Sequence, residues 1–177
     1  MPKRVLILGG AKSGKSDHAQ ALAEAAGPER VYLATAQARD QEMRRRIRRH
    51  QERRGAGWRT VEEPLELAAR LQELDAPGAV VLVDCLTLWL SNLLTLEGLE
   101  PPQIEQRGRE LAATVAGLKG DFFLVSNEVG WGIVPDNPLA RAFRDLAGGL
   151  NQALARVCDR VVLVAAGLPL VLKGEPG

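Results

Sequence analysis

The sequence predicts an α/β protein with a mostly parallel sheet and helices on both faces of the sheet. Short apolar runs alternate along the chain with segments of helical periodicity, which is typical of parallel strands joined by helices. The runs are continuously apolar, as expected of strands that are buried on both faces. We expect residues 1–177 to form a single domain, because 177 residues with 46% hydrophobic content supply one substantial core.

The elements follow from these patterns in chain order. The predicted parallel strands are residues 5–8, 31–34, 80–83, 122–125 and 161–164, with a further short strand at 58–62. The predicted helices are residues 16–26, 41–54, 65–74, 86–94, 103–118 and 139–157. Proline and glycine mark the joints between them as turns inside one domain. Residues 173–177 are predicted to be a frayed tail.

Composition excludes several classes of protein. The chain carries 23 Lys and Arg against 22 Asp and Glu, so its net charge of +1 gives no general attraction to nucleic acid or to a membrane surface. Its apolar runs are far shorter than the ~20 residues of a membrane span, and no signal peptide precedes the first strand. We therefore expect a cytoplasmic protein with no nucleic-acid partner. Cys85 and Cys158 lack metal-ligand spacing and are expected to be reduced.

A glycine-rich motif follows the first predicted strand and opens the first predicted helix. It consists of Gly9, Gly10, Ala11, Lys12, Ser13, Gly14, Lys15 and Ser16. In that context the spacing Gly-x4-Gly-Lys-Ser predicts a P-loop: backbone N–H groups turn toward phosphate oxygens, Lys15 reaches the outer phosphates, and the Ser16 hydroxyl ligates Mg²⁺. The predicted fold is thus a P-loop NTPase fold, with Lys15 as a catalytic residue.

Acidic residues at strand ends are candidates for the metal site. Asp84 ends the strand predicted at 80–83, where a second strand of a P-loop protein presents a carboxylate to the metal. We expect Ser16 and Asp84 to hold Mg²⁺ together. Glu62 and Glu128 also lie near strand ends, and a solvated acid or a helix cap remains an equal alternative for each.

The segment 44–54 is unusually basic, and three interpretations of it remain open from its residues alone. His50 shares a helical stripe with Met43 and Ile47, so it could be a core histidine beneath a solvated arginine face. The arginines could bind RNA, which the near-zero net charge disfavours. Alternatively, His50 could be a nucleophile whose neighbouring arginines stabilise phosphate charge.

Long blocks of the sequence resemble the bifunctional adenosylcobinamide kinase/adenosylcobinamide-phosphate guanylyltransferase family of cobalamin biosynthesis. The blocks are GGAKSGKS at 9–16, YLATA at 32–36, the spacing of Glu42, Met43, Arg46, Ile47 and His50, WRTVEEP at 58–64, VDCLTLWLSN at 83–92, VSNEVGWGIVP at 125–135, RAFRD at 141–145 and AGLPL at 166–170. They cover essentially the whole chain. One departure is Lys12, where the family usually has arginine.

The resemblance implies two reactions. The family phosphorylates adenosylcobinamide with ATP or GTP, then transfers GMP from GTP through a guanylyl-histidine to give adenosylcobinamide-GDP and pyrophosphate. His50 matches the guanylylated histidine. The positions that match nucleotide contacts are Ala34, Thr35, Ala36, Gln51, Glu52, Arg53, Arg54, Glu62 and Asp84.

The two reactions make a geometric demand. A P-loop ordinarily presents the γ-phosphorus, whereas guanylylation requires the α-phosphorus to reach His50, so the nucleotide or the basic segment must move or a neighbouring subunit must supply the segment. The family forms small oligomers, and the resemblance implies a trimer. The alternatives to this function are a monofunctional small-molecule P-loop kinase and, less favoured, an NTP-dependent RNA-binding module.

Overall fold

The computed structural model describes residues 3–36 and 55–175. The elements are β1 (Arg4–Gly9), α1 (Lys15–Ala26), β2 (Arg30–Ala34), β3 (Trp58–Glu62), α3 (Leu67–Leu74), β4 (Val80–Asp84), α4 (Leu86–Thr95), α5 (Pro101–Gly117), β5 (Asp121–Asn127), α6 (Pro138–Val157), β6 (Arg160–Ala165) and β7 (Leu168–Lys173). The six predicted strands and five of the six predicted helices are confirmed, while the helix predicted at 41–54 lies outside the described residues.

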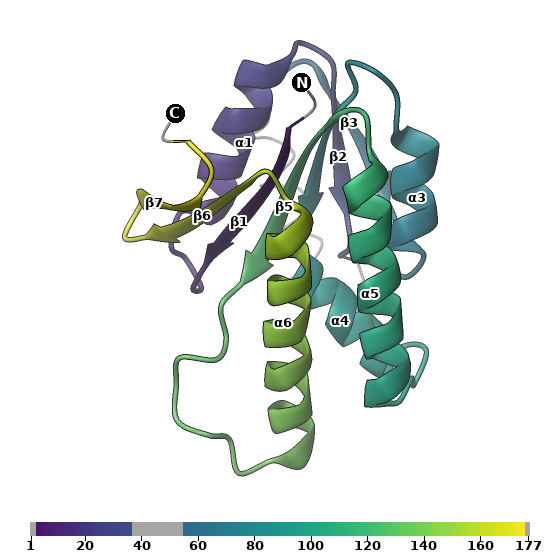
Figure 1. Ribbon diagram of the computed structural model, residues 1–177, viewed down its shortest axis with the longest axis vertical. Helices are drawn as coiled ribbons and strands as arrows, with labels where there is room; N and C mark the ends of the chain where they lie inside the picture. The colour runs from purple at the N-terminus through teal and green to yellow at the C-terminus, as the bar shows by residue number, and fades with distance from the viewer. Residues whose placement is uncertain (1–2, 37–54, 176–177) are drawn as a thin grey trace.

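The described strands form one seven-stranded sheet in the order β3-β2-β4-β5-β1-β6-β7. All neighbouring pairs among the strands β1, β2, β3, β4, β5 and β6 are parallel, and β7 pairs antiparallel with β6 at the edge. The parallel strands therefore end at the same edge of the sheet, which we call the carboxyl edge (Figure 1). Ligands of open α/β sheets bind in the crevice outside this edge.

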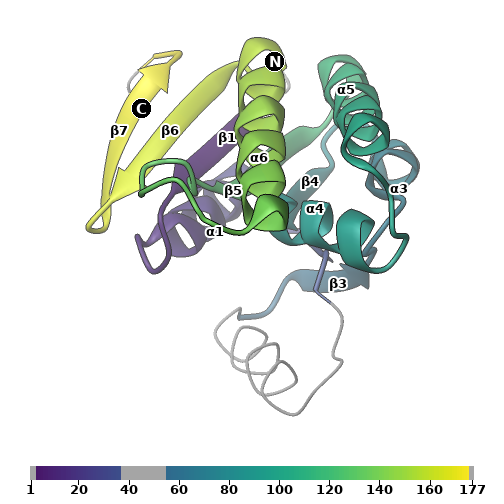
Figure 2. The same ribbon diagram turned by 90° about the horizontal axis from the view of Figure 1, so that it is seen from below.

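Two apolar layers cover the sheet, one on each face. Alternate strand residues such as Leu6, Val81 and Phe122 pack beneath α3, α4, α5 and α6. On the opposite face, Ile7 and its neighbours pack against α1, the one described helix on that side (Figure 2). The predicted mostly parallel sheet with helices on both faces is confirmed.

The helices α5 and α6 begin earlier than their apolar periodicity indicates, for identifiable reasons. α5 starts at Pro101, because proline fits the first helical turn and a capping box joins Glu100 to Gln103. α6 starts at Pro138, one residue before the prediction, and the side chain of Asn137 caps it by accepting from the amides of Leu139 at 2.8 Å and Ala140 at 3.1 Å.

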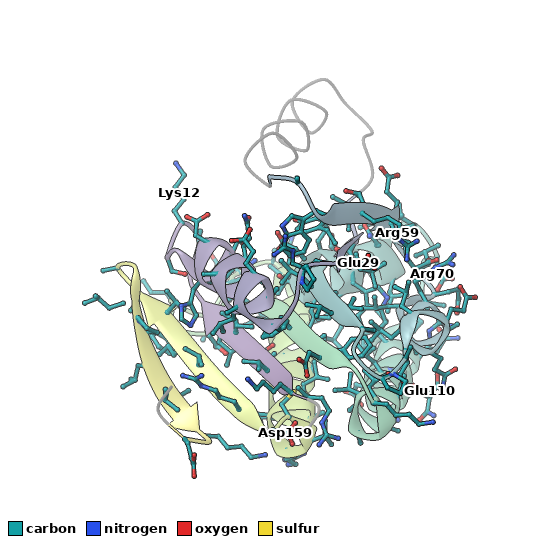
Figure 3. All side chains as sticks on the ribbon, turned by 90° about the horizontal axis from the view of Figure 1, so that it is seen from above. Lys12, Glu29, Arg59, Arg70, Glu110 and Asp159 are labelled. Atoms are coloured by element: carbon teal, nitrogen blue, oxygen red, sulfur yellow. The ribbon has the colours of Figure 1, made fainter. Side chains whose placement is uncertain are left out.

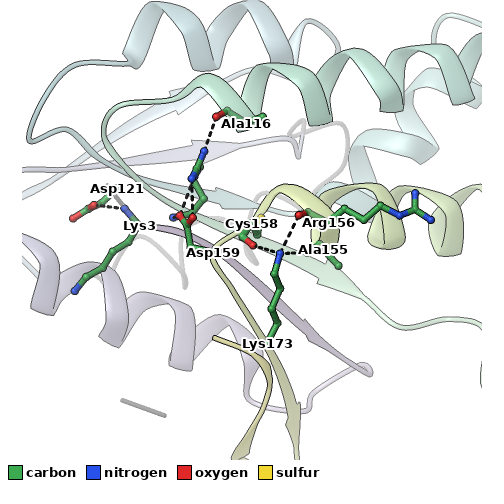
Figure 4. Close-up of polar contacts among 9 residues, drawn as sticks. Lys3, Ala116, Asp121, Ala155, Arg156, Cys158, Asp159 and Lys173 are labelled. Carbon is green, nitrogen blue, oxygen red and sulfur yellow. Dashed lines mark hydrogen bonds and ion pairs between the residues drawn. The ribbon is translucent and has the colours of Figure 1, made fainter. Parts of the chain in front are cut away.

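The strand β7 was not predicted from the sequence. Ala166 and Gly167 both have positive φ, 51° and 79°, which is the geometry of a two-residue hairpin turn, although alanine rarely adopts it. Pro169 argues against a central strand, but an edge strand tolerates it. The prediction of a frayed tail from residue 173 is wrong for Lys173, whose Nζ donates to the carbonyls of Ala155, Arg156 and Cys158 (Figure 4).

Polar contacts anchor the amino end of β1. The amide of Lys3 donates to Asp121 at 2.7 Å, and the guanidinium of Arg4 donates to Asp159 at 2.7 and 2.9 Å and to the carbonyl of Ala116 (Figure 4). The hydrogen bonds from Arg4 hold the pKa of Asp159 below its ordinary value. These contacts join the start of β1 to β5 and to the residue before β6, the strands on either side of β1. They therefore fix the strand that leads into the P-loop.

Candidate active site

The glycine-rich loop lies between the end of β1 and the start of α1 at the carboxyl edge. Gly14 is the N-cap residue of α1 and has φ 94°, a backbone conformation that residues other than glycine rarely adopt. A Cβ on Gly9 would lie 2.6 Å from the carbonyl oxygen of Val164, so only glycine fits against β6 there. The amide of Gly167 donates to the carbonyl of Ser13 at 2.8 Å, so the β6–β7 turn braces the loop from outside.

The two lysines of the loop differ in environment. Lys15 is buried, with 9% of its surface exposed, and its Nζ donates to the carbonyl of Gly10 at 3.1 Å. Its ammonium is therefore held within the loop, where a phosphate would bind. Lys12 has φ 56°, and its exposed side chain extends away from the ribbon (Figure 3).

Asp84 lies at the end of β4, two strands from the P-loop strand. The hydroxyl of Tyr32 on β2 donates to Oδ2 of Asp84 at 2.7 Å and so fixes the orientation of the carboxylate. Thr35 has a structural role at this point: its Oγ1 donates to the carbonyl of Cys85 at 2.8 Å and accepts from the amide of Cys85 at 2.9 Å. These bonds tie the end of β2 to the end of β4.

A cavity of about 570 Å³ opens at this edge. Predicted site residues that line it are Ala11, Lys12, Lys15, Ser16, Ala34, Ala36, Glu62 and Asp84. Gly9, Gly10, Ser13, Gly14 and Thr35 support the loop and the strand ends without lining the cavity. His50, Gln51, Glu52, Arg53 and Arg54 lie outside the described residues. Glu128 does not line the cavity either, and its Oε1 accepts from Asn151 Nδ2 at 3.0 Å.

Sequence reasoning missed several cavity residues. They are Tyr32, Thr60, Cys85, Thr87, Leu88, Ser91, Asn127, Val129 and Phe143. The position of Asn127 at the end of a strand was an available signal, since the same argument selected Asp84. Cys85 and Val129 lie just after the ends of β4 and β5. The others come from helices or from strand interiors, where no sequence pattern marks a residue that faces a cavity.

A polar network connects the strand ends behind the cavity. Asn127 Nδ2 donates to Thr87 Oγ1 at 2.9 Å, and Thr87 Oγ1 lies 3.2 Å from the sulfur of Cys85. Asn151 supports the next residues: it accepts from Ser126 Oγ at 2.6 Å and donates to the carbonyl of Asn127 at 3.2 Å. The network ties β4, β5, α4 and α6 together at the cavity floor.

The residues present fit one magnesium ion. Ser16 and Asp84 both line the cavity, and a hydroxyl plus one carboxylate is a donor set that Mg²⁺ accepts, because it keeps several waters and also binds substrate phosphates. The described residues contain no group of three or more His, Cys, Asp or Glu that could hold a metal by themselves. Such a site would thus depend on the nucleotide for its remaining ligands.

Both cysteines are free thiols, as expected, and both should resist alkylation. Burial raises the pKa of Cys85, and the neighbouring carboxylate of Asp84 raises it further. Burial also raises the pKa of Cys158 to about 12. Because the thiolate is the reactive form, iodoacetamide at pH 8 should modify the native protein at least about tenfold more slowly than the unfolded chain, as counted by mass spectrometry. Equal rates in the two states would contradict this prediction.

A phosphate-binding loop between the first strand and first helix of a mostly parallel sheet, with a carboxylate at the end of a nearby strand, defines a P-loop nucleotide-binding protein of the α/β class. The chain belongs to the cobinamide kinase/cobinamide phosphate guanyltransferase family, whose model matches residues 5–172. The resemblance seen in the sequence blocks is thereby confirmed.

Relatives of near-identical length support the assignment. The bifunctional adenosylcobalamin biosynthesis protein CobP of Pseudomonas aeruginosa is 51% identical over 98% of this chain and 99% of its own length. The corresponding CobU proteins of Salmonella typhimurium and Escherichia coli are 42% and 39% identical over 96% of this chain and 99% of theirs.

The P4 protein of bacteriophage phi6 in complex with ADP aligns at 14% identity and a TM-score of 0.47 over 94% of this chain, which spans about half (52%) of that structure.

None of the helices that the structure describes combines the length and apolar composition needed to cross a bilayer.

Proposed function

We propose that this protein catalyses two successive reactions of adenosylcobalamin biosynthesis. It phosphorylates the aminopropanol hydroxyl of adenosylcobinamide with ATP or GTP, and it then transfers GMP from GTP to the phosphate so formed. The observation that carries the proposal is the family match over residues 5–172, which includes every described element of the cavity. The relatives named as bifunctional biosynthesis proteins extend over nearly the same length.

In the first reaction the chain acts by positioning and by charge. The P-loop amides and the dipole of α1 hold the phosphates, and the Lys15 ammonium moves from the Gly10 carbonyl to the outer phosphates. Ser16 and Asp84 would hold Mg²⁺, which supplies positive charge to the β- and γ-phosphates when bound. The hydroxyl of Tyr32 holds the Asp84 carboxylate in a fixed orientation by donating to its Oδ2.

In the second reaction His50 is the nucleophile. Its neutral imidazole attacks the α-phosphorus of GTP, a P–N bond forms and pyrophosphate leaves; the corrinoid phosphate then takes the GMP and frees the histidine. In the proposal this nucleotide is contacted by Gln51, Glu52, Arg53 and Arg54, together with Ala34, Ala36 and Glu62. Thr35, which matches a nucleotide contact by resemblance, is fully buried and holds the strand ends in place instead. The support for the roles of His50 and residues 51–54 comes from the resemblance, because these residues lie outside the described part of the structure.

The proposal extends to the organisation of the protein. Residues 1–177 form one domain that acts in the cytoplasm, where nucleoside triphosphates are available, and the chains assemble as a homo-oligomer, a trimer by resemblance. The need to reach both the γ- and the α-phosphorus supports an oligomer, because a neighbouring subunit could contribute to the second reaction. Light scattering after size exclusion would measure the mass, and a monomer at assay concentration would contradict the assembly.

The test is incubation of the protein with adenosylcobinamide and GTP, with mass spectrometry of both the corrinoid and the protein. The proposal predicts adenosylcobinamide phosphate, adenosylcobinamide-GDP and a protein adduct of one GMP. A monofunctional kinase would stop at the phosphate and leave the protein unmodified. A protein that leaves adenosylcobinamide unchanged while it phosphorylates another alcohol would refute the proposal.

A further inference from the structure

The cavity at the carboxyl edge has walls of different chemistry. The P-loop wall carries Lys12, Lys15 and Ser16, and a second wall, which includes Glu62 and Asp84, is built from the ends of β2, β3 and β4. The remaining wall, called here the acceptor wall, consists of Thr87, Leu88, Ser91, Asn127, Val129 and Phe143. No charged side chain belongs to the acceptor wall among the residues that the structure describes. A phosphate chain binds to cations and amides, so this wall suits an uncharged group instead.

One polar atom of the acceptor wall needs a hydrogen-bond donor. Asn127 Nδ2 donates to Thr87, whereas Asn127 Oδ1 is buried and has no hydrogen-bond partner within residues 3–36 and 55–175. Phosphate oxygens are themselves acceptors and cannot satisfy this carbonyl, but a hydroxyl can. Because Oδ1 has almost no exposed surface, the amide has to turn toward the cavity when a hydroxyl binds.

The position of Asn127 in the sheet relates that atom to the phosphates. Asn127 pairs with Gly9, the first residue of the P-loop. Glu62, at the end of β3, lies three strand spacings from β5, which is about 14 Å at ~4.8 Å per spacing. A donor at Asn127 is therefore near the phosphate end of the cavity, where an alcohol must lie to attack the γ-phosphorus.

The loop that follows β5 carries exposed apolar residues directly after the acceptor wall in the chain. The loop 128–137 leaves β5 and runs below the carboxyl edge to the start of α6 (Figure 1). Val129 lines the cavity, and after it Trp131, Ile133 and Val134 are 74%, 95% and 57% exposed. Exposed apolar side chains that follow a cavity residue along one loop mark a surface that binds something apolar.

The size of the cavity decides which part of the second substrate can enter it. A volume of about 570 Å³ is in the range that holds one drug-sized ligand. A nucleoside triphosphate is such a ligand, so a whole corrinoid with its adenosyl group cannot enter beside it. Only a slender arm that ends in the hydroxyl can reach the phosphates, and the ring must remain at the rim.

We propose that the acceptor wall and the loop 128–137 form the corrinoid site, an assignment that rests on the proposed function. The aminopropanol arm lies along the acceptor wall with its hydroxyl near Asn127, and one face of the corrin ring lies on Trp131 and Ile133. The hydroxyl oxygen then attacks the γ-phosphorus, the bond to the bridging oxygen breaks, the nucleoside diphosphate leaves and the proton is released to solvent. Asn127 orients the hydroxyl and takes no proton.

The test compares Trp131→Ser and Ile133→Ser with Leu168→Ser, a matched control. Leu168 is 72% exposed, close to the exposure of Trp131, but it lies on the edge strand β7 and does not line the cavity. The two loop variants should raise the KM for adenosylcobinamide at least about tenfold, because they remove apolar contact area. The KM for GTP, the yield of guanylylated protein and the mass of the assembly should stay within about twofold. Leu168→Ser should leave the KM for adenosylcobinamide at the wild-type value.

Direct binding gives a second readout that does not depend on turnover. The corrinoid absorbs light near the emission of tryptophan, so adenosylcobinamide should quench the fluorescence of the wild type at saturating concentration and that of Trp131→Ser much less. An unchanged KM in both loop variants overturns the inference. So does a rise in KM that accompanies dissociation of the assembly, since the loop would then contact a second copy of the chain. If the wild type transfers no phosphoryl group to adenosylcobinamide, the proposed function itself fails and the inference falls with it.

Discussion

Replacing Lys15 by alanine is expected to weaken triphosphate binding at least about 100-fold. Its ammonium is buried at the first turn of α1 and already occupies a hydrogen-bonded position in the loop, 3.1 Å from the Gly10 carbonyl. A charge-assisted hydrogen bond to phosphate contributes about 1.5–3 kcal/mol, and 100-fold in affinity corresponds to about 2.7 kcal/mol. Isothermal titration calorimetry with GTP and Mg²⁺ measures the change.

The matched control for this prediction is Lys12→Ala. It removes the same charge from the same loop. Lys12 also lines the cavity, but its side chain is exposed and extends away from the ribbon, whereas Lys15 is buried (Figure 3). Exposed charges contribute about 0–1 kcal/mol, so we expect less than about fivefold weaker binding. Equal losses in the two variants would mean that net charge, not the position of the ammonium, accounts for affinity. Unchanged affinity in Lys15→Ala would refute the P-loop assignment.

Replacing His50 by asparagine is expected to abolish the covalent guanylyl-protein. With GTP labelled at the α-phosphorus, the wild type should retain an acid-labile and base-stable label, which is the signature of a phosphoramidate, and the variant should retain none. Asparagine has a similar size but no nucleophilic nitrogen, so the loss should exceed 100-fold, as is usual for removal of a catalytic nucleophile.

The same variant should keep the first reaction. Phosphorylation of adenosylcobinamide uses the γ-phosphorus and the P-loop, so its rate in His50→Asn should stay within about threefold of the wild type. Accumulation of adenosylcobinamide phosphate without adenosylcobinamide-GDP is the expected product pattern. Equal labelling of wild type and variant would exclude His50 as the nucleophile, and parallel loss of both reactions would indicate a structural role for the histidine.

The parts of the fold that could be predicted are those with a local physical cause. The parallel strands could be predicted because a strand buried on both faces is continuously apolar, as residues 80–83 are. The P-loop is equally local, since glycine is required where Gly14 adopts φ 94°. β7 had no such signal: its leucines are exposed, it contains Pro169, and its pairing with β6 decides its structure.

The candidate site divides in the same way. Lys15, Ser16 and Asp84 could be named from the sequence because their chemistry is tied to a motif or to the end of an apolar strand. Tyr32 could not, because its hydroxyl reaches Asp84 across 52 residues of chain. Thr35 matched a nucleotide contact by resemblance, yet its side chain hydrogen-bonds to the backbone of Cys85.

The sequence by itself determined the fold class, the phosphate-binding loop and the family. Hydrophobic periodicity, glycine-dependent backbone geometry and long blocks that resemble the family are all local features of the sequence. Only the tertiary structure decided which uncharged residues share a cavity with that loop. Asn127 lines the cavity because β5 lies beside β1, the P-loop strand. Phe143 lines it because α6 packs on the sheet face that also carries α4. Sheet order and helix packing bring such neighbours together. Both depend on the whole chain, so they produce no local sequence pattern at the individual residues.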